Sequence, residues 1–108
     1  MFKTEYIICA ANYYNDGVVQ DHRPRNIQEG FVICGHRHHN CIGTFAQMMG
    51  FPYSDEAMRI HQTEIQGFLT NTNRFVEREE AREIAFKAGQ ITLESYNNIR
   101  RLHSEDLY

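Results

Sequence analysis

The chain has 108 residues, a hydrophobic content of 42% and a net charge of −3, which together are typical of one packed domain, residues 1–108. No apolar run approaches the ~20 residues that span a bilayer and no signal peptide is recognisable, so we expect a soluble, cytoplasmic protein without membrane contacts. The excess of acidic residues disfavours long nucleic acids as partners, and the small core of so short a domain favours self-association.

The first part of the chain is expected to form a β-hairpin followed by a central strand. Residues 6–11 are an apolar run of strand length, and Asn15-Asp16-Gly17 supplies turn residues before the apolar pair 18–19. A polar loop that contains a proline comes next. Residues 31–34 form another apolar run, which the pattern predicts to be a buried central strand.

Two helices, a second hairpin and a further helix are expected after this strand. Apolar residues recur at helical spacing from residue 37 to 49, and residues 54–60 predict a short second helix. Residues 65–70 and 74–76 are two apolar runs around a polar turn, which is the pattern of a hairpin. Residues 78–87 show the clearest helical pattern, with acidic residues in the first turn and a glycine shortly after the last.

The end of the chain has a mixed pattern. One helix would place Leu93, Tyr96, Ile99 and Leu102 on the same face. The order of strands and helices predicts the α+β class, with a small mixed or antiparallel sheet built from two hairpins and a central strand and packed with two or three helices. No repeat or linker divides the chain, so any site must be built from pieces of one core.

The densest polar cluster lies between the predicted central strand and the helix that follows it. The first turn of a helix presents unpaired backbone N–H groups and a partial positive charge, and basic side chains there add further donors. The cluster therefore predicts a binding site for a phosphate or pyrophosphate. Its candidate ligand-binding residues are Arg37, His38, His39 and Asn40. In the alternative interpretation these side chains cap the helix, are solvated and bind no ligand.

A metal site is a second alternative for the same region, because histidine and cysteine are common ligands of zinc. A small metal-dependent nucleotide hydrolase would use Cys34, His36 and His39. The spacing supplies no second pair of ligands, and Cys41 belongs to the apolar side of the predicted helix, so we expect no metal and no cofactor. The apolar neighbours of Cys34 predict that it is buried, which disfavours a catalytic nucleophile at this position.

A second group of candidate residues lies on and beside the second predicted hairpin. An aromatic face can stack a purine, and amide and guanidinium groups can bond its edge or a phosphate. The candidate ligand-binding residues of this group are Phe68, Asn71, Asn73, Arg74 and Phe75. In the alternative interpretation both phenylalanines belong to the core and the polar residues form only a turn, and for Phe75 the core is favoured.

The remaining basic residues lie on the last predicted helix and near the end of the chain. Arg78 and Arg82 alternate with acidic residues on that helix, which is typical of a solvated face supported by ion pairs. Arg100 and Arg101 form a small basic group ahead of the acidic ending. We include Arg101 as a candidate ligand-binding residue that joins a phosphate site on a neighbouring subunit.

Four parts of the chain, which together cover most of its length, are similar to a known protein family. They are residues 6–11, 30–41, 66–70 with 73–81, and the ending Ser104-Glu105-Asp106-Leu107-Tyr108. On these segments the chain resembles the first type of Thoeris anti-defence protein. This is a family of small proteins encoded by phages and prophages.

The resemblance implies a function in binding and not in catalysis. Members of this family bind cyclic ADP-ribose isomers made by bacterial TIR-domain defence enzymes and hold them intact, and some relatives also capture cyclic oligonucleotides at separate sites. It also implies a homo-oligomer with ligand sites at subunit contacts. Such a ligand offers an adenine to stack, ribose hydroxyls to bond and a pyrophosphate to neutralise. An interaction domain that blocks a host protein remains a third hypothesis beside the binder and the hydrolase.

Overall fold

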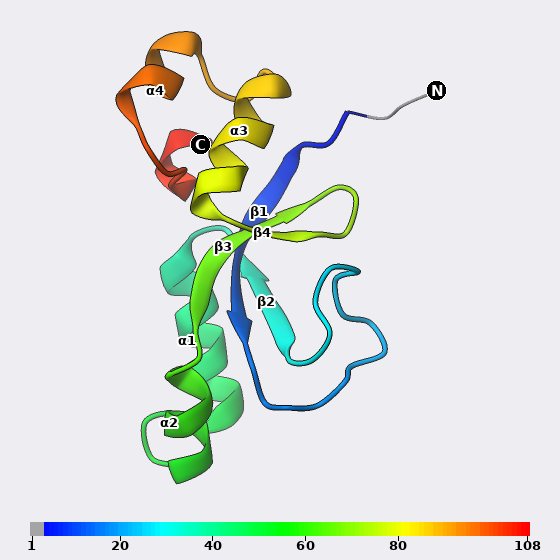
Figure 1. Ribbon diagram of the computed structural model, residues 1–108. Helices are drawn as coiled ribbons and strands as arrows, with labels where there is room; N and C mark the ends of the chain where they lie inside the picture. Colours follow the sequence, from blue (N-terminus) through cyan, green and yellow to red (C-terminus); the bar gives the residue numbers. More distant parts are fainter. Residues whose placement is uncertain (1–3) are drawn as a thin grey trace.

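The computed structural model of the chain describes residues 4–108, which form one four-stranded antiparallel sheet with helices packed against it (Figure 1). The spatial order of the strands is β2-β1-β3-β4, and all three pairings are antiparallel. The strands are β1 (Ile7–Tyr14), β2 (Phe31–Gly35), β3 (Ile65–Thr70) and β4 (Phe75–Glu77). The predicted α+β class is therefore confirmed.

Four α-helices and one short 3₁₀ helix accompany the sheet. They are α1 (His38–Met49), α2 (Asp55–His61), α3 (Arg78–Lys87), α4 (Leu93–Asn98) and η1 (Ser104–Asp106). The start of α2 is fixed by the Ser54 hydroxyl, which accepts a hydrogen bond from the Ala57 N–H at 3.2 Å. Gly50 ends α1 in the left-handed conformation with φ 74°, which costs a glycine little. Within residues 4–108, no helix has the length and apolar character needed to cross a bilayer.

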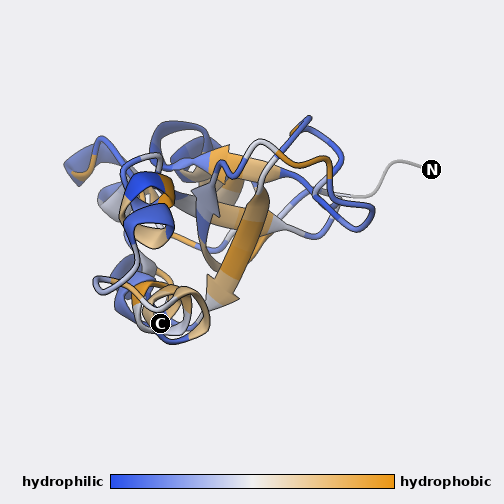
Figure 2. Cartoon of the chain, turned by 90° about the horizontal axis from the view of Figure 1, so that it is seen from below, coloured by the Kyte–Doolittle hydropathy of each residue, from blue (hydrophilic) through white to orange (hydrophobic). Residues whose placement is uncertain are grey.

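The core lies between the sheet and helices α1 and α3. Successive residues of a strand point to opposite faces, so Ala10 and Tyr14 of β1 share one face and are both fully buried. The Tyr14 ring stacks on Phe45 of α1 with a centroid distance of 4.1 Å, and Ala81, Ile84 and Ala85 of α3 belong to the same buried cluster. In Figure 2 the hydrophobic colouring follows the strands, whereas the long loops are mostly hydrophilic.

The prediction of a first hairpin is wrong for its second strand, residues 18–19. Asn15 and Asp16 accept hydrogen bonds from the N–H groups of Gly17 and Val18 at 2.9 and 3.0 Å, and these local bonds end the strand without returning it. Val18 and Val19 are exposed, and Val19 makes only an isolated bridge. The antiparallel strand that pairs with β1 here is instead β2, which follows a loop over residues 15–30.

Two further expectations are corrected. Residues 31–34 do form a strand, but β2 lies at the edge of the sheet and β1 and β3 are the central strands. The single helical stripe expected from Leu93 to Leu102 is also wrong, because α4 ends at Asn98. Leu93 is exposed and Leu102 is fully buried in the core, so the two residues do not lie on one helical face. The predicted helix over 78–87 has the same bounds as α3.

Backbone and ring atoms of β4 lie very close to Gly67 of β3. A Cβ atom at this position would lie 2.8 Å from the Phe75 ring and would also collide with the Val76 carbonyl oxygen. Any larger residue would therefore push β4 away from β3. Gly43, on the exposed side of α1, has open space where its Cβ would be.

We predict that Gly67→Ala lowers the free energy of unfolding by about 1–3 kcal/mol, because the added methyl overpacks a contact with backbone and ring atoms. The matched control, Gly43→Ala, should be neutral or stabilising by up to about 1 kcal/mol, since alanine favours the helix. Urea denaturation followed by circular dichroism measures both changes. Equal effects of the two substitutions would contradict this account of Gly67.

Candidate functional site

The end of the chain meets the starts of α1 and α3 at one place. Arg78, the first residue of α3, donates from Nη1 to the Leu102 carbonyl at 2.9 Å, and the Leu102 N–H donates to the Arg78 carbonyl at 3.0 Å. The Leu102 side chain is fully buried. Figure 1 shows the C-terminal segment lying beside α3. This pairing holds residues 101–108, here called the C-terminal segment, against the start of α3.

A pocket of about 470 Å³ lies at this junction. It is lined by Glu64, Ile65, Gln66, Glu77, Arg78, Glu79, Arg101 and His103, and is called the junction pocket below. Burial, and next the repulsion by the Arg101 guanidinium, lower the pKa of Arg78. Both guanidinium groups line the same pocket, and neighbouring carboxylates, including Glu79, offset part of the repulsion between them.

Hydrogen bonds hold the polar side chains of the junction pocket in place. Gln66 accepts from Arg78 Nη2 at 2.7 Å and donates to Glu64 at 3.2 Å. Glu64 also accepts a 2.6 Å bond from the hydroxyl of the buried Tyr14. Arg101 is exposed and forms no ion pair with any residue from 4 to 108. The Arg101 guanidinium is thus the uncommitted cation of this pocket.

The start of α1 lies on the other side of the C-terminal segment. Arg37 donates to the Tyr108 carbonyl, and its guanidinium lies 5.2 Å from the centroid of the Tyr108 ring, which also stacks on His36 at 4.5 Å. The Nη1 atom of Arg37 has no acceptor among the residues described. Of the predicted site residues, Arg37 therefore contacts the C-terminal segment, Arg101 belongs to that segment, and His38 follows Arg37 at the start of α1.

His38 is a core residue and does not face solvent. Its Nε2 lies 2.8 Å from the Gly67 carbonyl, to which it donates, and its ring meets Phe68 edge-on at 5.1 Å. Burial lowers the pKa of His38, and Arg78 adds to this effect. A neutral imidazole bonded to the sheet cannot also serve as the phosphate donor that the sequence predicted.

His39 and Asn40 are exposed in the first turn of α1. The Asn40 side-chain oxygen accepts from the Arg37 N–H at 3.0 Å, so Asn40 orders the start of the helix. That contact agrees with the helix-capping alternative for Asn40. His39 keeps the accessibility that a ligand would need.

The tip of the β3–β4 hairpin is a separate structure. It projects away from α1 (Figure 1), and its residues are committed to other contacts. Asn71 accepts from the Tyr6 N–H at 2.7 Å, and Asn73 occupies the turn with φ 61°. Arg74 bonds both carboxylate oxygens of Glu5 at 2.8 and 2.9 Å and also pairs with Glu80.

The charge of Arg74 is therefore already neutralised. Hydrogen bonding to Arg74 is the largest cause that lowers the pKa of Glu5 to about 2. An anionic ligand would have to displace this carboxylate before it could reach Arg74. The arginine predicted to bind phosphate is instead part of an ion pair that joins the beginning of the chain to the hairpin.

The two phenylalanines of the hairpin have different surroundings. Phe68 is fully buried in the core, so its ring offers no free face on which a base could stack. Phe75 is 7% exposed, and the accessible part of its ring lines a second pocket on the sheet face opposite to α1. Its neighbour across the sheet is Tyr13, with a centroid distance of 5.9 Å.

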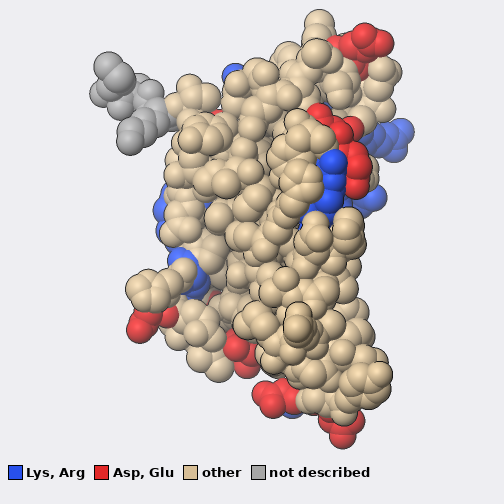
Figure 3. Space-filling model, turned by 180° about the vertical axis from the view of Figure 1, so that it is seen from behind, with Lys and Arg blue, Asp and Glu red and all other residues tan. Residues whose placement is uncertain are grey.

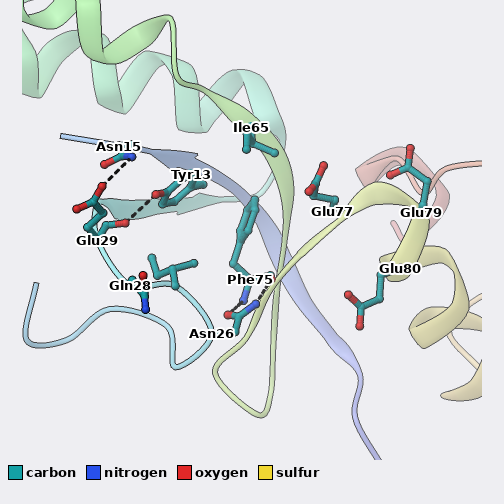
Figure 4. A pocket seen from close by; sticks show the side chains of 11 residues that line it. Tyr13, Asn15, Asn26, Gln28, Glu29, Ile65, Phe75, Glu77, Glu79 and Glu80 are labelled. Atoms are coloured by element: carbon teal, nitrogen blue, oxygen red, sulfur yellow. Dashed lines mark hydrogen bonds between the residues drawn. The ribbon is translucent and has the colours of Figure 1, made fainter. Parts of the chain in front are cut away.

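This second pocket has a volume of about 790 Å³ and is shown in Figure 4. It is called the acidic pocket here, because its charged lining residues are Glu29, Glu77, Glu79 and Glu80. No Lys, Arg or His belongs to its lining, so its field repels a phosphate. Ile65, Glu77 and Glu79 line both pockets, which therefore share a wall.

The residues of the hydrolase hypothesis are not brought together. Cys34 is exposed on β2, which corrects the expectation that it is buried, and the neighbouring Cys9 thiol and partial burial raise the pKa of Cys34. His36 stacks on Tyr108, and His39 lies in the first turn of α1. Among residues 4–108, no three His, Cys, Asp or Glu side chains converge in a way that could hold a metal ion.

Two arginines of α3 were wrongly expected on a solvated face. Arg78 is bonded as described above, and Arg82 donates to the Tyr96 carbonyl at 2.7 Å with its guanidinium 3.6 Å from the Tyr96 ring centroid. A basic residue at the start of a helix opposes the helix dipole. The position of Arg78 in the first turn of α3 therefore indicated that its guanidinium has specific acceptors elsewhere in the fold. The sequence analysis did not use this signal.

Basic residues do not form one continuous surface on the face seen in Figure 3. Charged groups there are scattered among uncharged atoms, and several basic groups lie directly beside acidic ones. The electrostatic potential of a site on this face is consequently determined by the few charged side chains next to it. One local example is the junction pocket, where two arginines lie among three carboxylates, and the other is the acidic pocket, whose charged lining residues are all carboxylates.

The family model described as phage T4 y16D protein matches residues 6–108, which is nearly the whole chain. No match was found among curated proteins. No match was found among solved structures.

We predict that the protein loses stability as the pH falls below the ordinary His pKa of about 6.5. The folded-state pKa of His38 is lowered, so the unfolded chain binds a proton that the folded chain refuses, and acid favours unfolding. Urea denaturation at several values between pH 5 and pH 8 measures this slope. His38→Gln, which keeps a donor but does not titrate, should have a shallower slope, and the exposed control His39→Gln should retain that of the wild type. Equal slopes for wild type and His38→Gln would disprove this role.

Proposed function

The chain belongs to the phage T4 y16D protein family, and on this premise we propose that it binds and sequesters a cyclic ADP-ribose-type second messenger without cleaving it. The function would be carried out in the cytosol of the bacterial host, as a phage countermeasure to a nucleotide-based defence. The sequence resemblance to Thoeris anti-defence proteins supports the choice of ligand. The junction pocket supports the choice of site.

The observation that carries the proposal is the proximity of Arg78 and Arg101 in the junction pocket. Arg78 is held by Gln66 and Leu102, whereas Arg101 is exposed and unpaired among the residues described. A pyrophosphate placed between them would gain two charge-assisted hydrogen bonds, which have to outweigh the repulsion from Glu64, Glu77 and Glu79 in the same lining. His103 lines the same pocket and would add a donor.

Other lining groups suit the remaining parts of the ligand. The carboxylate of Glu64 and the amide of Gln66 can accept hydrogen bonds from ribose hydroxyls. Ile65 is 37% exposed and offers an apolar surface to the adenine. In this proposal a second copy of the chain closes the open side of the pocket, which would place the ligand at a subunit contact.

Sequestration needs tight binding and no reactive group. A protein that competes by equilibrium capture must hold its ligand with a sub-micromolar Kd and be as abundant as the ligand. Because the fixed polar groups of the junction pocket bind without an activated nucleophile, they suit this task. A hydrolase would need in addition a base and a nucleophile directed at one bond.

Titration calorimetry with a cyclic ADP-ribose isomer tests the proposal, with linear ADP-ribose as the comparison ligand. We expect a sub-micromolar Kd for wild type and a loss of about 1.5–3 kcal/mol, roughly 10- to 150-fold, in Arg101→Ala, since one charge-assisted contact is removed. Arg100→Ala is the matched control, because it removes the same charge one residue away and Arg100 does not line the pocket. Equal weakening by both substitutions would refute the site.

Recovery of the ligand separates a binder from an enzyme. The saturated complex is heated to unfold the protein, and the released nucleotide is identified by liquid chromatography and mass spectrometry. We expect the intact cyclic compound in an amount equal to that bound. Linear ADP-ribose accumulating with time would instead establish hydrolysis.

A further inference from the structure

The acidic pocket has a built aromatic floor. Asn26 holds Phe75 with two hydrogen bonds, donating to the Phe75 carbonyl at 2.6 Å and accepting from the Phe75 N–H at 2.8 Å. Gly67 leaves the space in which the Phe75 ring lies. The Tyr13 hydroxyl donates to the Glu29 carbonyl at 2.7 Å and thereby fixes the loop that forms one wall. The floor is thus ordered without a ligand.

Carboxylates lie on both sides of this floor. Figure 4 shows Glu29 on one side of the Tyr13 and Phe75 rings and Glu77, Glu79 and Glu80 on the other. Glu80 is paired with Arg74 at 2.8 Å. Within residues 4–108 none of the other three carboxylates forms an ion pair. The pocket therefore has carboxylates without an ion-pair partner at two ends and an apolar aromatic surface between them, and Glu29 also accepts a hydrogen bond from the Asn15 amide at 3.3 Å.

We propose that the acidic pocket binds a linear aliphatic polyamine. An ammonium group near Glu29 and another near Glu77 and Glu79 would each meet a carboxylate, and the methylene chain between them would cover the aromatic floor. An ammonium over Tyr13 or Phe75 is also attracted by the ring face. The volume of about 790 Å³ falls within the usual range for small-molecule sites.

The charge pattern favours a polyamine over other ligands. A phosphate would meet four carboxylates and no cation in this lining, and an isolated metal ion would gain nothing from contact with the aromatic rings. Each exposed ion pair is weak and is screened by salt, so the affinity must come from several pairs acting together. This proposal concerns a different pocket from the proposed nucleotide site and does not depend on it.

The experiment is calorimetric titration of the full chain with spermidine at low ionic strength. We expect saturable binding at one site, at least tenfold weaker at 0.5 M salt, and no binding of the uncharged analogue 1,8-octanediol. The double variant Glu29→Gln/Glu77→Gln should weaken spermidine binding at least tenfold. The control Glu94→Gln, on the exposed side of α4, should leave the Kd unchanged.

A site-resolved measurement guards against a general attraction of polycations to an acidic protein. Spermidine should shift the backbone amide resonances of Phe75 and Glu77, and those of α4 should remain in place. Equal weakening by the Glu94 control, or shifts spread over all acidic residues, would overturn the proposal. Tighter, Glu29- and Glu77-dependent binding of a tri-arginine peptide would also overturn it and would assign the pocket to a basic protein segment.

Discussion

The backbone at Gly67 is the constraint on which the rest of the structure depends. Its carbonyl accepts the hydrogen bond of His38 and so ties α1 to the central part of the sheet. Its missing side chain lets Phe75 of β4 lie against β3 and form the floor of the acidic pocket. The start of α1 and the aromatic floor of the acidic pocket therefore both depend on Gly67. Only glycine allows β4 to come this close to the main chain of β3.

The local elements could be predicted from the sequence, whereas their pairing could not. The acidic first turn and apolar face of α3 are signals contained within ten residues, and they gave its bounds correctly. The turn residues at Asn15-Asp16-Gly17 were recognised too. They were taken as the tip of a hairpin, but their side chains bond the following N–H groups and end the strand. The choice of β2 as partner depends on contacts across a long loop, which no local pattern contains.

The candidate site was predicted only in part, for the same reason. The sequence predicted that Arg37 and Arg101 bind a ligand, and the structure leaves both without a carboxylate partner among residues 4–108. Arg74 looked equally free, but its partner Glu5 is 69 positions away. Residue type indicates what a side chain can bind. Only the fold determines whether a neighbour has already bound it.

The wall between the two pockets has a thermodynamic consequence. Glu77 and Glu79 face both cavities, so a cation held in one neutralises charge that an anion in the other would otherwise oppose. Occupancy of the two cavities would then be linked with positive cooperativity, and by reciprocity each guest would tighten the other by the same factor. If both guests bind as proposed, two side chains would couple chemically opposite ligands within a domain of 108 residues.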